Sequence, residues 1–499
     1  QTASRFRGIG RYTMSFTRAV VRNRGEHEII LALNGMFPET IEPIRAAFDG
    51  LLQHHHIRVW TAPGPVRAIN PDNDVRNSVA KVIREAFLAG LHPDIIHISS
   101  LFEGYDDDAV TGIRITDSFI PVSVTLYDLI PLLNPDHYLK PIPHYAQHYY
   151  SKLNDLKKAS VCLAISESSR QEGLAYLKAA DSRVVNVSTA HDSHFQPCHL
   201  TDDLAGQLRL KFGLTRPFIL YTGGFEERKN VPRLIQAFAN LPEKLRTGHQ
   251  LLLAGKMPPG YRDHLDKIIN SAGIKQDELL FTDYIADEEL VQLYNLCKLF
   301  VFPSWHEGFG LTVLEAMACG APVICSNNSS IPEVIGLDSA MFNPFEVGEI
   351  TARIVKALED ETFRKLLQQH GLHRAKLFSW DESARWAIAA WERIGHAGSG
   401  VVQKSGQSWK NTEATLNNLY TRQISDIAAL VGKSKPVSET VLTGVAVCLE
   451  QNERQVYNFL RATELPMHIT WRIEGPFDSS YSLALVNRET ARALAELGH

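Results

Sequence analysis

Two glutamates, Glu307 and Glu315, stand eight positions apart in the stretch HEGFGLTVLEAMACGAPVIC, which also carries Gly308 and Gly310. The glycines allow close approach of the backbone where a helix is expected to begin, and a helix start favours a phosphate through its unpaired N–H groups. Eight helical steps cover about 12 Å, roughly the reach from a sugar ring to a ribose across a diphosphate. The pattern predicts two carboxylates that bind hydroxyls at both ends of a sugar nucleotide. An ordinary helix with two solvated glutamates is the alternative.

A pair of cations follows a strand expected at residues 218–222, in the sequence GGFEERKN. Asn230 is expected to cap the next helix, so Arg228 and Lys229 lie at a helix start, where the helix dipole disfavours positive charge. Their placement beside Gly224 indicates an anion such as a diphosphate leaving group. A solvated Arg-Lys pair is the alternative.

The elements that must position these residues alternate between apolar strands and amphipathic helices, which predicts parallel α/β sheets. Ligands of such sheets bind at the carboxyl ends of the strands. This rule selects Tyr127 and Asp128, which follow a strand expected at 122–125. Further strands of the first half are expected at 57–60, 95–99, 161–165 and 184–187.

A basic loop, SRFRGIGRY, leads into a helix expected from Tyr12 to Arg24. Gly8 and Gly10 permit close approach of a diphosphate or an acceptor, and Arg11 supplies a cation. A structural turn explains Gly-x-Gly equally well. A doubly wound sheet needs a strand in front of such a loop, and we expect that strand upstream of residue 1.

Composition and spacing divide the chain into five parts. We expect a Rossmann-like domain at 1–196, without its first strand, a second at 217–380, and a crossing helix at 381–396. A helical linker is expected at 397–465, because apolar residues recur at helical spacing from 416 to 430 and a second helix is predicted near 438–449. The strand, loop and helix expected in 466–499 indicate the start of a further α/β module. A C-terminal extension particular to this protein is the alternative.

Composition and charge exclude several classes of function. The 499 residues carry a formal net charge of -5, which argues against a nucleic-acid binder, and no apolar run has transmembrane length. Six scattered cysteines without zinc spacing indicate reduced thiols in a cytoplasmic protein. The runs at 54–56 (three histidines) and 106–108 (three aspartates) suggest metal ligands only weakly, since adjacent side chains do not converge, and we expect no metal site.

The two glutamates, the Gly-x-Gly corner and the following Gly-Ala-Pro-Val closely resemble the donor-site motif of retaining glycosyltransferase family 4, and the resemblance covers about residues 1–395. It implies the GT-B architecture, in which two Rossmann-like doubly wound domains face each other across a cleft. It also implies that Glu307 lies beside the donor sugar, that Glu315 holds the ribose and that Lys229 binds phosphate. Catalytic positions fall on Glu307, Asp128 and Tyr127, where many family members have histidine in place of Tyr127. The remaining donor contacts implied are Arg228, Gly224, Gly308, Phe309, Gly310 and Leu311, with Gly8, Gly10 and Arg11 in a loop facing the cleft.

Within this family, SRFRGIGRY, LYDLIPL and the tandem module most resemble bacterial O-antigen and polysaccharide mannosyltransferases that use GDP-mannose. The resemblance implies transfer of mannose from a nucleotide-sugar donor to a glycan or lipid-linked glycan, without cofactor or metal. It places the protein in the cytoplasm, meeting the inner face of the cell membrane through a partner. The alternatives are a UDP-sugar-dependent transferase, a sugar-nucleotide epimerase of the same fold and a non-catalytic module that binds a glycan or partner.

Overall fold

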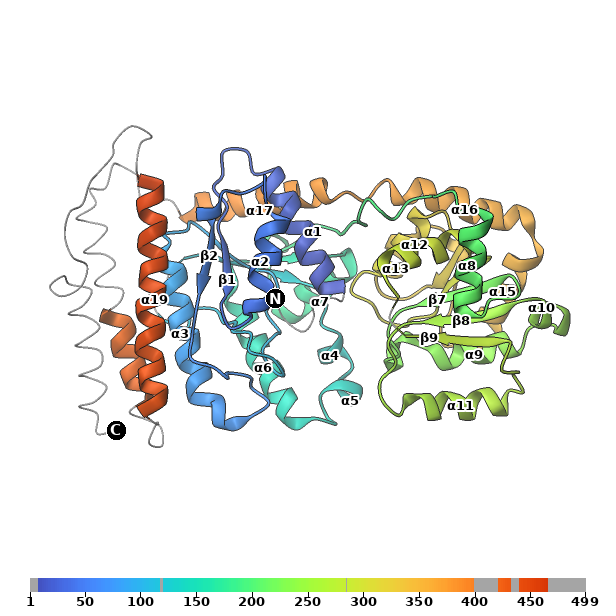
Figure 1. Cartoon of the computed structure of the whole chain (residues 1–499), viewed down its shortest axis with the longest axis horizontal. Helices are drawn as coiled ribbons and strands as arrows, with labels where there is room; N and C mark the ends of the chain where they lie inside the picture. Colours follow the sequence, from blue (N-terminus) through green and yellow to red (C-terminus); the bar gives the residue numbers. More distant parts are fainter. Residues whose placement is uncertain (1–7, 117–119, 284, 399–420, 432–438, 465–499) are drawn as a thin grey trace.

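The computed structural model describes residues 8–116, 120–283, 285–398, 421–431 and 439–464. These residues form two α/β lobes that lie side by side, with the C-terminal helices against the outer side of the first lobe (Figure 1). The predicted parallel α/β fold of two facing lobes is confirmed. The strand, loop and helix expected in 466–499 lie outside the described residues.

The first lobe contains two separate parallel sheets, ordered β1-β2 and β3-β4-β5-β6. The sequences of its strands are short apolar runs, because helices cover both faces of the sheets. The strands are β1 (Leu31–Asn34), β2 (Ile57–Trp60), β3 (Ile96–Ile98), β4 (Val122–Leu126), β5 (Val161–Ala164) and β6 (Val184–Asn186). The helices are α1 (Gly8–Arg22), α2 (Pro38–Ala47), α3 (Asp74–Gly90), α4 (Ile130–Leu133), α5 (Pro135–Tyr138), α6 (Pro143–Lys158) and α7 (Glu167–Leu177).

The second lobe contains one six-stranded sheet in the order β12-β11-β10-β7-β8-β9, and every neighbouring pair is parallel. The central strands are fully buried, as five successive buried residues of β7 show. Its strands are β7 (Phe218–Thr222), β8 (Gln250–Ala254), β9 (Leu279–Thr282), β10 (Leu299–Phe302), β11 (Val323–Ser326) and β12 (Met341–Phe342). Its helices are α8 (Asp202–Phe212), α9 (Val231–Ala239), α10 (Glu243–Gly248), α11 (Tyr261–Ser271), α12 (Asp287–Leu296), α13 (Leu311–Ala318), α14 (Ile331–Ile335), α15 (Val347–Glu359) and α16 (Glu361–Ala375).

Helix α17 (Trp380–Gly398) leaves the second lobe and packs along α1 of the first (Figure 1). Beyond it, a helix at 421–431 and the long helix α19 (Glu439–Glu464) bury apolar side chains against β2 and α3. The predicted end of this last helix near residue 449 is wrong, because the apolar face of α19 continues through Val456 and Leu460 into the same core. Among the described helices, none is both long and apolar enough to cross a membrane.

The start of α1 also differs from the prediction. The helix begins at Gly8 and not at Tyr12, so Gly8 and Gly10 lie in its first turns and do not form a loop. Glycine costs about 1 kcal/mol in a helix interior, and this cost favours a loop on sequence grounds. Tertiary packing offsets it, because the ring of Tyr12 lies 5.3 Å from the rings of both Tyr127 and Trp380.

Candidate functional site

The corner between β10 and α13 holds the two motif glycines, of which Gly308 has a close backbone contact and Gly310 a left-handed backbone. A side chain on Gly308 would place its Cβ 2.5 Å from the carbonyl oxygen of Tyr127 in the other lobe. Gly310 has a φ of +98°, and its Cβ would lie 2.5 Å from Ile331. The Ser169 hydroxyl donates to the Gly308 carbonyl over 3.0 Å. The motif corner is therefore one of the points at which the two lobes touch.

Glu307 lies at this corner with both predicted cations against it. Its carboxylate is 2.8 Å from Arg228 Nη1 and 2.6 Å from Lys229 Nζ, and it accepts a hydrogen bond from the Ser304 hydroxyl. Burial alone would raise the pKa of Glu307, but the two cations hold this pKa at about 2. The carboxylate is thus ionised between two cations in a largely buried position, and the carboxyl groups of Asp128 and Glu226 also act on Arg228.

The cations are held by the short turn Glu227–Lys229, which precedes α9. Trp305 N–H and the Ser304 hydroxyl both donate to the Arg228 carbonyl over 2.9 Å, so this turn is tied to the β10 corner. Asn230 occupies the cap position of α9, but the predicted side-chain cap is wrong. Its amide instead donates to the carbonyls of Pro303 and Pro344, which joins three loops at one edge of the sheet.

Glu315 lies inside α13 and contacts the first lobe through Arg11. Arg11 Nη1 is 3.1 Å from Glu315, and Arg11 also pairs with Asp287 at the start of α12. Burial raises the pKa of Glu315 to about 7, although Arg11 opposes the rise. The predicted cation and the predicted ribose acceptor are therefore paired with each other, which their sequence positions did not indicate.

Asp128 and Tyr127 meet the corner in different ways. Asp128 Oδ2 would lie 3.2 Å from a Cβ on Gly308, so this carboxyl faces the motif directly. Burial raises the pKa of Asp128, and the nearby Arg228 opposes the rise. The Tyr127 hydroxyl lies 3.0 Å from Thr13 Oγ1, so only the Tyr127 backbone reaches the corner. We therefore place Asp128, and not the Tyr127 phenol, at the contact between lobes.

The other predicted contacts are more distant or structural. Phe309 is buried with its ring 5.7 Å from that of Phe378, and Leu311 starts α13. A Cβ on Gly224 would meet only the carboxylate of Glu226, the flexible end of a neighbouring side chain. Gly8 is exposed, and a Cβ there would meet nothing within 4 Å.

Several polar groups that sequence reasoning missed join the lobes. The Glu333 carboxylate accepts from the first N–H groups of α7, Glu167 at 2.8 Å and Ser168 at 3.0 Å. His306 lies 2.9 Å from Glu172 of the first lobe. The motif itself contained His306, but its partner is 134 positions away, and no local pattern indicates such a pair.

The two runs considered as metal ligands have local contacts. Asp108 accepts from the backbone N–H groups of Val66 and Arg67, and Asp107 accepts from that of Ala109. The histidines at 54–56 form a short helical turn before β2. Within the described ranges, no group of three or more His, Cys, Asp or Glu side chains is arranged to hold a metal ion.

Comparison with known proteins adds a family to this geometry. A family model described as glycosyl transferases group 1 matches residues 209–374. The serotype-specific mannosyltransferase WbdA of Escherichia coli is 38% identical over 395 residues, which cover 79% of this chain and 47% of WbdA. The O-antigen chain mannosyltransferase B of E. coli is 33% identical over 271 residues, which cover 54% of this chain and 70% of that protein. The chain thus spans about half the length of WbdA.

Solved structures share the two-lobed fold at low sequence identity. HepE of Anabaena, in complex with UDP and glucose, matches with a TM-score of 0.55 and 18% identity over 80% of this chain and 98% of HepE. WaaG, a glycosyltransferase involved in lipopolysaccharide biosynthesis, matches with a TM-score of 0.51 and 17% identity over 74% of this chain and 100% of WaaG. These likenesses establish the architecture around the corner.

Proposed function

Because the chain belongs to the group 1 glycosyl transferases, we propose that it is a retaining transferase that moves mannose from GDP-mannose onto a growing polysaccharide or O-antigen chain. The names of WbdA and of mannosyltransferase B support mannose as the sugar and an O-antigen as the acceptor. The resemblance of the SRFRGIGRY and LYDLIPL segments to GDP-mannose-dependent enzymes supports the guanine nucleotide. The acceptor is a glycan or a lipid-linked glycan, met at the inner face of the cell membrane through a partner.

The observation that carries the proposal is the cluster of Arg228, Lys229 and Glu307. The cluster holds two cations in a largely buried place at the corner, next to the start of α13. Cations held in this way favour an anionic ligand, because hydrogen bonds between charged groups are stronger than neutral ones. The negatively charged diphosphate of a sugar nucleotide binds these cations, and the backbone N–H groups at the start of α13 donate further hydrogen bonds to it.

The remaining side chains take roles that follow from their positions. Glu315 accepts the ribose hydroxyls once Arg11 releases it, and Glu307 orients the donor sugar at the corner. The acceptor hydroxyl enters beside Asp128. The bond from the sugar C1 to the diphosphate breaks as the bond from C1 to the acceptor oxygen forms on the same face. The leaving phosphate oxygen takes the acceptor's proton. Arg228 and Lys229 stabilise the charge that develops on this phosphate, so the step needs no metal ion.

The test is a thermal-shift screen of GDP-mannose against UDP- and ADP-sugars, with and without EDTA. A donor at 100 times its Kd stabilises the folded state by about 2.7 kcal/mol through mass action. We expect GDP-mannose to raise the melting temperature equally in EDTA, and Lys229→Met to abolish the shift. The matched control is Lys256→Met, because Lys256 is exposed in the loop after β8, at the same edge of the sheet. Stabilisation by a UDP-sugar alone would reassign the donor, and no shift with any donor would overturn the proposal.

A further inference from the structure

The turn that carries Asp128 is held by a side chain of α7. The Ile130 N–H donates to Oδ1 of Asp128 over 3.0 Å, so the aspartate itself closes one end of the turn. The Leu129 N–H donates instead to Oε2 of Glu172 over 2.9 Å. Leu129 is fully buried, so its N–H needs a partner within the protein. The orientation of the Asp128 turn therefore depends on Glu172.

The second oxygen of Glu172 reaches the other lobe. Oε1 of Glu172 lies 2.9 Å from Nε2 of His306, and both side chains are only 12% exposed. His306 directly precedes Glu307 at the motif corner, and its backbone carbonyl accepts from Arg228 over 3.1 Å. One carboxylate thus contacts the turn of Asp128 with one oxygen and the neighbour of Glu307 with the other.

A third side chain decides which nitrogen of the His306 ring carries the proton. Asn134 Nδ2 donates to the Ile130 carbonyl over 3.0 Å, which fixes the orientation of this amide because a carbonyl oxygen accepts only from its nitrogen end. The same Nδ2 lies 3.1 Å from Nδ1 of His306. Nδ1 is therefore the acceptor, and Nε2–H donates to Glu172. We call Asn134, Glu172 and His306 the lobe clamp.

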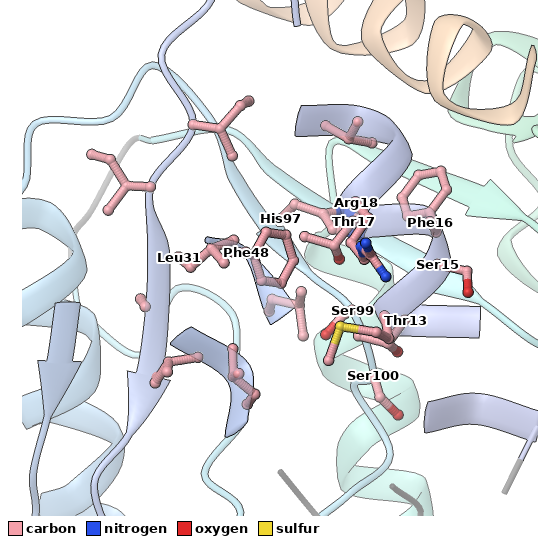
Figure 2. Close-up of a pocket in the computed structure, with 18 of the residues that line it drawn as sticks. Thr13, Ser15, Phe16, Thr17, Arg18, Leu31, Phe48, His97, Ser99 and Ser100 are labelled. Atoms are coloured by element: carbon pink, nitrogen blue, oxygen red, sulfur yellow. The ribbon is translucent and has the colours of Figure 1, made fainter. Parts of the chain in front are cut away.

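The large cavity of the first lobe is separate from the lobe clamp. It has a volume of about 1960 Å³ and is lined by residues of α1, β1 and β3 (Figure 2). Asn134, Glu172 and His306 are not among its lining residues. Thr13, which Figure 2 labels, lines this cavity and contacts the hydroxyl of Tyr127. Substitutions in the lobe clamp therefore change the contact between the lobes and leave the cavity wall as it is.

We propose that Glu172 and His306 are positioning residues of the transfer reaction, which fix the place of Asp128 relative to Glu307. The inference rests on the proposed function, in which the acceptor enters beside Asp128 and the donor sugar lies at Glu307. The new bond forms on the face from which the diphosphate leaves, so the two sides must be held together closely. A displacement of about 1 Å can cost about 100-fold in rate. The lobe clamp thus acts on kcat and not on donor binding.

An amide in place of the Glu172 carboxylate separates this role from a structural one. Two donors, Leu129 N–H and His306 Nε2–H, face the carboxylate, whereas a glutamine has only one acceptor oxygen. In Glu172→Gln, the glutamine oxygen accepts from Leu129 and its NH2 group faces the ring N–H of His306. In His306→Phe that ring N–H is absent, so the same substitution meets no second donor.

The test is a double-mutant cycle of Glu172→Gln and His306→Phe, assayed by transfer from GDP-mannose to a fluorescently labelled α-mannobiose. We expect Glu172→Gln to lower kcat by at least about tenfold in the parent chain, with the KM for GDP-mannose changed by less than about twofold. In the His306→Phe chain, the same substitution should change kcat by less than about twofold. The matched control is Glu42→Gln, an exposed glutamate of α2 in the same lobe that pairs with Arg45, and its kcat should equal that of the parent.

A spectroscopic readout does not depend on transfer. Long-range ¹H–¹⁵N spectra of histidine-labelled protein at pH 8 should show His306, identified by its absence from His306→Phe, as the Nε2–H tautomer. The Nδ1–H tautomer, or an equal fall of kcat on Glu172→Gln in both backgrounds, would overturn the proposal. A rise in KM that matches the fall in kcat would also overturn it, since Glu172 would then act in donor binding. Absence of transfer by the parent chain would instead overturn the proposed function, and this role with it, while the tautomer would still report the contact.

Discussion

Replacing Glu307 with glutamine should destabilise the protein, because it leaves Arg228 and Lys229 facing each other without their carboxylate. Breaking a buried ion pair by removing one partner costs about 3–5 kcal/mol. The pKa of Glu307 leads to a similar figure independently. Its fall from 4.5 to about 2, at 1.36 kcal/mol per pKa unit, corresponds to about 3 kcal/mol of stability at neutral pH. The side chain is only 9% exposed, so solvent screening reduces this figure little.

The sign of the pH dependence makes the prediction sharper. Because the folded-state pKa is depressed, the contribution of Glu307 is fully present above pH 4.5 and is lost as the pH falls towards 2. The difference between the parent chain and Glu307→Gln should therefore be about 3 kcal/mol at pH 7 and smaller by about 1 kcal/mol at pH 4.

Urea unfolding followed by tryptophan fluorescence at both pH values measures this difference. The matched control is Glu243→Gln, an exposed glutamate of α10 in the same lobe, which should change the free energy of unfolding by less than about 0.5 kcal/mol. Diphosphate should stabilise the Glu307→Gln protein more than the parent, since the anion then takes the place of the lost carboxylate. The reasoning is refuted if Glu307→Gln matches the parent at pH 7, or if the difference is the same at pH 4.

Three further predictions concern the contact between the lobes. The affinity for the donor should fall as the pH drops from 8 to 6, because Glu315, with a pKa of about 7, binds ribose hydroxyls best as a carboxylate. Isothermal titration calorimetry measures this pH dependence, which should be absent in Glu315→Gln. Gly308→Ala should lower the rate of transfer by at least about tenfold, because the new Cβ, 2.5 Å from the Tyr127 carbonyl, forces the lobes apart. Its circular dichroism should stay unchanged, and wild-type activity would contradict this contact. Gly310→Ala should lower the free energy of unfolding of the second lobe by about 1–3 kcal/mol, measured by calorimetry, because alanine is strained at a φ of +98° and its Cβ collides with Ile331. An unchanged melting temperature would show that the corner relaxes.

Strands and the glycine corner before α13 were predictable from sequence because both are local patterns. The bounds of β7 agree with the strand expected at 218–222, since a central parallel strand is buried on both faces and carries a continuous apolar signal. The glycines at 308 and 310 stand where the backbone has no room for a side chain. Helix ends were less predictable, as α1 and α19 show, because packing against distant residues extends them past weak local signals.

Pairings across the cleft were not predictable. Arg11 and Glu315 are 304 positions apart. In the sequence, each of them alone suggests a ligand-binding residue. The side chain of Asn230 has the type expected of a helix cap, yet two nearby carbonyls compete successfully for its amide. The hydroxyl of Tyr127 turns towards Thr13 for the same reason, since a partner from a different element decides the direction of a polar side chain.

The path of α17 constrains how the two lobes can move. The chain passes from the first lobe to the second ahead of β7 and returns as α17 (Figure 1). The indole N–H of Trp391 in this helix donates to Ser123 of β4 over 2.8 Å. Because the chain crosses between the lobes twice, the cleft can open by rotation about the line that joins the two crossings but not by simple separation of the lobes. Such a rotation has to break the contact of Gly308 with Tyr127 and Ser169.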